Sequence, residues 1–161
     1  MKQEIKLSLT TLITEDIKAA RQFYEGCLNQ IPSIDSENHV MYTSGFSLWE
    51  RSYAENLVFG KKLNLKSGID FSHEICFEAK ALKPLEEFLL DKNVPFVNPL
   101  TEQPWGQLVM RIRDPDGRVI ELGEPLLDTV SRIWLETGKN KEITSERTHI
   151  PMEVLDSYLP I

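Results

Sequence analysis

The strongest constraint on this chain is an internal repeat of strand and helix patterns. Apolar and polar residues alternate over residues 4–13, which predicts a strand, and a helix with one apolar face follows. A short strand and a two-strand hairpin complete this unit, and the same order recurs in the second half. Matching Leu9 to Glu74 and Glu50 to Glu121 gives offsets of about 65 and 71 residues. Two such half-sheets can bury their open faces only against each other or against another copy.

The repeat predicts an α+β fold of two tandem βαβββ modules. We expect the modules at residues 4–51 and 70–124, joined by a polar linker at 52–69. Together they form a domain of residues 1–124, and residues 125–161 form an all-helical tail. Whether the two modules close within one chain or across a dimer stays open at this point.

Length and composition are typical of one globular domain and argue against several classes of partner. The chain has 161 residues, a net charge of −7 and an isoelectric point near 5.0, which argues against nucleic acid and anionic lipid as partners. No run approaches the ~20 apolar residues that span a bilayer, and residues 1–12 do not resemble a signal peptide. We therefore expect a cytoplasmic protein, with Cys27 and Cys76 as reduced thiols.

The tail predicts one long helix followed by two short ones. An apolar stripe begins at Leu126, Gly138 is a suitable helix end, and short helices are expected at 142–148 and 151–159. This order resembles a helix-turn-helix hairpin. Residues 125–161 carry four bases against six acids, however, so the tail would repel phosphates. Packing or dimerisation is the role that we expect for it.

Three motifs of the repeat point to one family. They are Asp16-Ile17 followed by Phe23-Tyr24-Glu25 and Leu28, then His73-Glu74-Ile75-Cys76-Phe77-Glu78, then Asp114-Pro115-Asp116-Gly117-Arg118-Val119-Ile120-Glu121. Together they resemble the vicinal oxygen chelate superfamily of glyoxalase I, bleomycin resistance proteins and extradiol dioxygenases. The resemblance implies a curved mixed sheet around a ligand pocket, commonly in a homodimer. Pro104-Trp105-Gly106-Gln107 further resembles a glyoxalase-like subgroup, some of whose members carry a helical tail.

The resemblance also implies candidate metal ligands and catalytic residues. In metal-using members, four ligands lie on the first and last strands of the modules. Here the first position falls on Leu9, which cannot ligate a metal, and the last-strand positions fall on Glu50 and Glu121, either of which would be the catalytic base. The cofactor implied is a divalent metal (Mg, Mn, Ni or Zn), with an acidic site favouring Mg²⁺ or Mn²⁺. The alternative is that the two glutamates pair with bases such as Arg51, Arg111 or Arg113.

The remaining ligand position has two neighbouring candidates. Because strand side chains alternate, Ile75 and Phe77 should face the helix, which places Glu74 and Cys76 on the pocket side. Glu74 is therefore the better match for a metal or ligand contact. A register shift of one residue would exchange it for His73, which we otherwise expect to be structural.

The expected ligand is a small organic molecule held in the cup of the sheet. Trp105 is placed to stack on it, unless this aromatic residue fills a gap in the module interface instead. Besides Trp105, the predicted contacts are Leu9, Glu50, Glu74, Cys76 and Glu121.

Whether the chain is an enzyme stays open. One alternative is a metal-dependent lyase or isomerase of the glyoxalase I type, similar to a lactoylglutathione lyase. Another is a non-catalytic protein that sequesters a drug or metabolite, and a third is a regulatory protein that acts through its tail. An extradiol dioxygenase is disfavoured because its Fe(II) site uses two histidines and one carboxylate.

Overall fold

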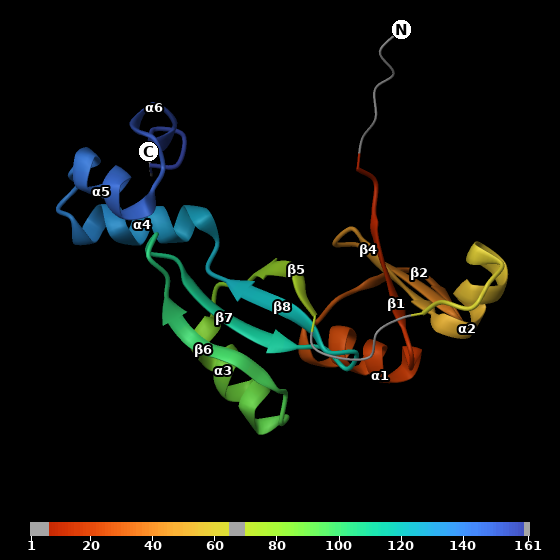
Figure 1. The fold of residues 1–161 in the computed structure, drawn as a ribbon. Helices are drawn as coiled ribbons and strands as arrows, with labels where there is room; N and C mark the ends of the chain where they lie inside the picture. Colours follow the sequence, from red (N-terminus) through yellow and green to blue (C-terminus); the bar gives the residue numbers. More distant parts are fainter. Residues whose placement is uncertain (1–6, 65–69, 160–161) are drawn as a thin grey trace, which may run out of the picture. The chain divides into compact units, whose positions relative to one another are not determined.

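The computed structural model describes residues 7–64 and 70–159. The chain divides into two compact units, Met1–Ile69 with Pro115–Gly117 and Asp70–Asp114 with Arg118–Ile161 (Figure 1). Each unit contains one four-stranded mixed sheet and its helices. The α+β class and the two tandem modules predicted from the repeat are confirmed.

The first unit has the predicted order of strand, helix and three strands. Its sheet has the order β1-β4-β3-β2, with β1 parallel to β4 and the other pairs antiparallel. The elements are β1 (Thr10–Thr14), helix α1 (Ile17–Arg21) continued by the π-helical segment η1 (Gln22–Cys27), β2 (Pro32–Ser36), β3 (His39–Tyr42) and β4 (Phe46–Glu50).

Helix α1 forms where the sequence supplies a cap and an apolar face. The side chain of Asp16 accepts hydrogen bonds from the N–H groups of Lys18 and Ala19, which have no partner within the helix. The buried face continues into Tyr24, whose ring lies 5.1 Å from that of Phe46 on β4. The core of this unit therefore lies between α1–η1 and the sheet face that carries Phe46.

The linker contains helical structure that its polar sequence did not indicate. Helix α2 (Arg51–Ala54) follows β4 directly, and the π-helical segment η2 (Glu55–Phe59) continues it. The carboxylate of Glu55 is 3% exposed and pairs with Arg51 and Lys62. It also accepts a hydrogen bond from the N–H of Leu63, so one buried acid holds this turn of chain together.

The second unit repeats the topology of the first. Its sheet has the order β5-β8-β7-β6, again with the first and last strands of the module parallel. The elements are β5 (Asp70–Glu78), α3 (Leu82–Asp91), β6 (Phe96–Glu102), β7 (Leu108–Arg113) and β8 (Arg118–Gly123). Both modules enter their last strand through a glycine with positive φ, Gly45 at 93° and Gly117 at 85°. Only glycine adopts this conformation without strain, which explains why the turn recurs.

The tail is helical, as predicted, and belongs to the second unit. It consists of α4 (Leu126–Glu136), α5 (Lys141–Thr148) and α6 (Met152–Leu155), the last shorter than expected. Asn140 caps α5 by accepting a hydrogen bond from the N–H of Ile143 at 2.9 Å. Within the described residues, none of the helices has the length and apolar character needed to cross a membrane.

Candidate functional site

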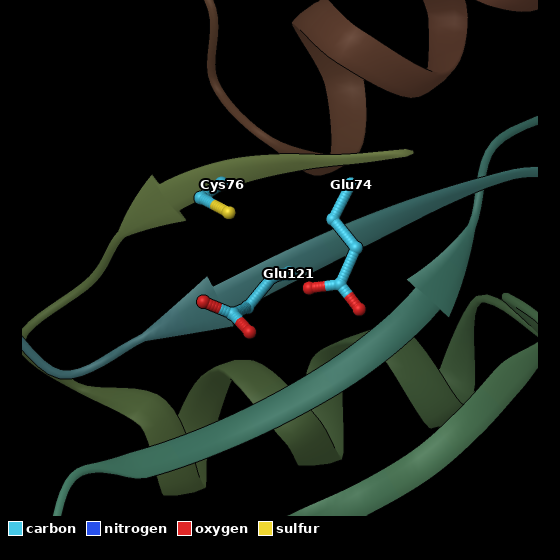
Figure 2. Close-up of side chains that lie close together, drawn as sticks. All are labelled: Glu74, Cys76 and Glu121. Atoms are coloured by element: carbon cyan, nitrogen blue, oxygen red, sulfur yellow. The ribbon is translucent and has the colours of Figure 1, made fainter. Parts of the chain in front are cut away.

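Three of the predicted contact residues lie together on the sheet of the second unit. Glu74 and Cys76 come from β5 and Glu121 from β8, and one ligand atom from each lies within 4.8 Å of the others (Figure 2). The register pairs Cys76 with Glu121, so their side chains lie on the same face of the sheet. Ile75 and Phe77 alternate to the other face, so Glu74 and Cys76 share one face, as strand alternation predicts. We call Glu74, Cys76 and Glu121 the β5–β8 cluster.

Arg111 on β7 joins this cluster and was not among the predicted contacts. Its Nε donates a hydrogen bond to Glu74 Oε1 at 2.9 Å, and its Nη2 donates to Glu121 Oε2. The pairing of Glu121 with an arginine was one sequence-based alternative, and the structure confirms it for Arg111. The guanidinium is 19% exposed and Glu121 15% exposed, so this ion pair is largely withdrawn from water.

Burial and charge change the acidity of two members of the cluster. The pKa of Glu121 is raised, first by burial and then by the negative charge of Glu74, although the charge of Arg111 opposes this rise. The pKa of the Cys76 thiol is also raised, first by partial withdrawal of the thiol from water and then by the charge of Glu121, although the residue as a whole is exposed. Cys76 is therefore a protonated thiol near neutral pH, and Glu121 holds a proton more readily than an ordinary glutamate.

His73 does not belong to the cluster. β5 first pairs with β8 at Asp70, and after an irregularity in the register the continuous pairing begins at Glu74, opposite Val119. His73 is exposed, and its Nδ1 lies 3.3 Å from the Ser72 hydroxyl. Glu74 rather than His73 is the residue that this strand contributes to the cluster.

Glu50 belongs to the first unit and has a local structural role there. Its carboxylate accepts hydrogen bonds from the N–H of Tyr53 at 2.9 Å and the hydroxyl of Ser52 at 2.7 Å, and so caps helix α2. Burial raises the pKa of Glu50, but these hydrogen bonds outweigh it and the net shift is downward. Strand alternation places Glu50 on the sheet face of Phe46, the face that packs against α1–η1.

The neighbour of Glu50, Trp49, lies on the opposite sheet face of the first unit. Its ring lies 4.4 Å from that of His39 and 5.5 Å from that of Tyr53 on α2, centroid to centroid. The contact with Tyr53 packs Trp49 against the short helix α2 that follows β4. Leu9 is half-buried and immediately precedes β1. Its role as a ligand contact stays a prediction.

Trp105 lies in the loop between β6 and β7, which contacts the tail. Its Nε1 donates a hydrogen bond to Gln107 Oε1 at 3.0 Å. The carbonyl oxygen of Gly106 accepts a hydrogen bond from Arg132 Nη2 of α4 at 2.7 Å, and Arg132 also pairs with Glu124. The loop is thus held by residues far away in sequence. Stacking of Trp105 on a ligand stays a prediction.

A divalent metal is the cofactor that the family resemblance implies, and the cluster can be tested for its fit. Two carboxylates and a thiol within 4.8 Å are a possible ligand set. Arg111, however, already donates hydrogen bonds to both carboxylates, and its guanidinium stays charged at any ordinary pH. The residues as arranged therefore do not fit a divalent cation.

Comparison with known proteins agrees with this architecture. The family model of the glyoxalase-like domain matches residues 7–127, and the chain therefore belongs to this family, within the vicinal oxygen chelate superfamily. The tail from residue 128 onward lies outside the match. No curated protein sequence matches the chain.

Several solved structures share the fold. A protein of unknown function from Agrobacterium tumefaciens str. C58 is 26% identical with a TM-score of 0.67, covering 77% of this chain and 97% of its own. A lactoylglutathione lyase from Agrobacterium tumefaciens is 20% identical with a TM-score of 0.58, covering 76% of this chain and 96% of its own. A glyoxalase/bleomycin resistance protein/dioxygenase family enzyme from Burkholderia phytofirmans PsJN is 19% identical with a TM-score of 0.62, covering 74% and 98%. At these last two identities the likeness shows the fold alone.

Proposed function

We propose that this protein binds a small organic molecule at the β5–β8 cluster, with Glu74, Cys76 and Glu121 as contacts. The observation that carries the proposal is the grouping of these three side chains on one sheet face with a half-buried, charge-paired arginine. Half-buried ion pairs add little to stability compared with apolar packing, so stability alone does not account for this grouping, and a role in binding is supported.

The cluster presents both hydrogen-bond donors and acceptors to a ligand. The two carboxylates accept hydrogen bonds, while the guanidinium of Arg111 and the thiol of Cys76 can donate them. Glu74 is the more accessible acid, with 38% of its side chain exposed, against 15% for Glu121. A polar ligand carrying an amine or hydroxyl group would reach Glu74 first and would compete with Arg111 for Glu121.

The thiol of Cys76 provides a direct test of ligand binding at this place. In a Cys27→Ser background, a panel of small amines, alcohols and drug-like cations is first screened by thermal shift. Compounds that bind are expected to slow the alkylation of Cys76 by iodoacetamide, because Cys76 is exposed in the free protein. Binding compounds that leave the alkylation rate unchanged would place the ligand elsewhere and contradict the proposal.

Two substitutions provide the matched comparison for this test. Glu74→Gln removes one charge from the cluster and is expected to weaken both the thermal shift and the protection of Cys76. Glu153→Gln removes one charge from an exposed position on α6 and is expected to change neither. An equal loss in both variants would show that net charge, not the cluster, governs binding.

Proton transfer is a second candidate function, favoured by the raised pKa of Glu121. A carboxylate with a raised pKa is a stronger general base than an ordinary glutamate, and Glu121 lies beside a guanidinium that can stabilise developing negative charge. Glyoxalase-type isomerisation of the methylglyoxal–glutathione hemithioacetal is the reaction to assay. A measurable rate that Glu121→Gln abolishes would support this function, and a rate unaffected by Glu121→Gln would exclude Glu121 as the base.

The proposal includes a homodimer, which family membership supports. Sedimentation equilibrium gives the mass directly, and a value near 18.5 kDa for the monomer at all concentrations would refute the dimer.

A further inference from the structure

Arg111 holds two carboxylates that come from different strands. It reaches Glu74 of β5 through Nε and Glu121 of β8 through Nη2, while its own strand, β7, pairs with β8 and places Arg111 opposite Glu121. The planar guanidinium is suited to this double contact because its donors lie in a fixed fork. One positive charge therefore lies between two carboxylates, and a bound cation would need the same two carboxylates.

A divalent cation would compete with this guanidinium for the same oxygen atoms. To bind Glu74 and Glu121, the ion would have to break both hydrogen bonds of Arg111 and leave the guanidinium without these acceptors. If Arg111 stayed, two like charges would lie within a few ångströms of each other beside Glu121, whose side chain is largely withdrawn from water. Both routes disfavour the metal.

We propose that Arg111 is the permanent cation of the β5–β8 cluster and takes the place that a divalent metal would need, so that the site is metal-independent. Arg111 is then a positioning residue that holds Glu74 and Glu121 for an organic ligand. The inference rests on the proposed function for the identity of the site. The inference is tested by metal affinity, which is measured separately from the binding of any organic compound.

The proposal predicts that removing the charge of Arg111 creates a metal site. Arg111→Met keeps an unbranched side chain but has neither charge nor donors, so the two carboxylates and Cys76 become available together. By equilibrium dialysis, Zn²⁺ is expected to bind Arg111→Met at least ~100-fold more tightly than wild type, or about 2.7 kcal/mol. Co²⁺ should also give a thiolate charge-transfer band in this variant, which reports Cys76 as a ligand.

Three further variants control for charge and position. Arg111→Lys keeps the positive charge and is expected to bind Zn²⁺ as weakly as wild type. Arg113→Met removes one charge from the same strand and is also expected to leave Zn²⁺ affinity unchanged. Adding Glu121→Gln to Arg111→Met should abolish the gain, because it removes one of the three ligands.

Two results would overturn the proposal. The first is stoichiometric, micromolar or tighter binding of Zn²⁺ or Mn²⁺ to the wild-type protein that Glu121→Gln abolishes. The second is an Arg111→Met variant with a native circular dichroism spectrum and no gain in affinity. If Arg111→Met fails to fold, Arg111→Gln replaces it, and the wild-type measurement decides independently. A gain in metal affinity without any organic ligand being found would support this inference and leave the proposed function refuted.

Discussion

A single methyl group at Gly106 should disturb the contact between the β6–β7 loop and the tail. Gly106 has φ of +81°, and a Cβ there would overlap Cδ1 of Ile133 on α4, a side chain that is fully buried. The positive φ costs a non-glycine residue roughly 1–2 kcal/mol. Overpacking a buried contact costs a further ~1–3 kcal/mol. We therefore expect Gly106→Ala to lower the free energy of unfolding by about 2–5 kcal/mol.

Two comparisons separate the backbone cost from the overlap. Gly138 has φ of +64° and open space around its Cα, so Gly138→Ala should show the backbone cost alone. Ile133→Val deletes the overlapping Cδ1 atom, at a cost of ~0.5–1.5 kcal/mol by itself. In that background, Gly106→Ala should cost ~1–3 kcal/mol less than in the wild type.

Urea unfolding followed by circular dichroism measures the free energy of unfolding of the wild type and of the four variants. Two outcomes of this measurement would contradict the predicted packing. Gly106→Ala could lower the free energy of unfolding by no more than Gly138→Ala does, and its interaction free energy with Ile133→Val could lie within ~0.5 kcal/mol of zero. The loop that carries Trp105 would then not be packed on α4, and the reasoning would be refuted.

Two further predictions concern ionisable groups. The pKa of Glu55 is lowered to about 2, chiefly by hydrogen bonds from Lys62 and the backbone, so the ionised form stabilises the fold above pH ~4.3 and this stability is lost as the pH falls toward 2. Glu55→Gln should remove most of this acid dependence, measured as the difference between the free energies of urea unfolding at pH 3 and pH 6. An equal difference in the wild type and the variant would contradict the prediction. The raised pKa of Cys76 predicts that its alkylation, followed in a variant without the other cysteine, becomes half-maximal above pH ~8.5. Glu121→Gln should shift that midpoint downward, because burial would then act without the neighbouring charge, and an unchanged midpoint would show that Glu121 does not influence the thiol.

The orientation of Glu74 and Cys76 could be predicted from the sequence, whereas that of Glu50 could not. On β5, the apolar side chains of Ile75 and Phe77 determine which residues face the helix, so alternation alone orients Glu74 and Cys76. On β4, Glu50 is the last residue of the strand and begins a helix that the polar sequence of the linker did not indicate.

A better alignment of the two modules was available from the turn glycines. Trp49 follows Gly45 at the same interval as Glu121 follows Gly117, and both glycines have positive φ. Counting from these turns would have matched Trp49, not Glu50, to Glu121. A shift of one residue moves a side chain to the other face of the sheet, so the two alignments predict different residues for the first module.

The sequence by itself determined the duplication, the order of elements in each module and the tail of helices, because these depend on local periodicity and turn residues repeated along the chain. Only the tertiary structure decided that Arg111 joins Glu74 to Glu121 and that the loop of Trp105 rests on α4. These contacts depend on strand register and on packing between distant segments. Side-chain patterns specify which face a residue occupies, but they do not specify which partner lies across from it.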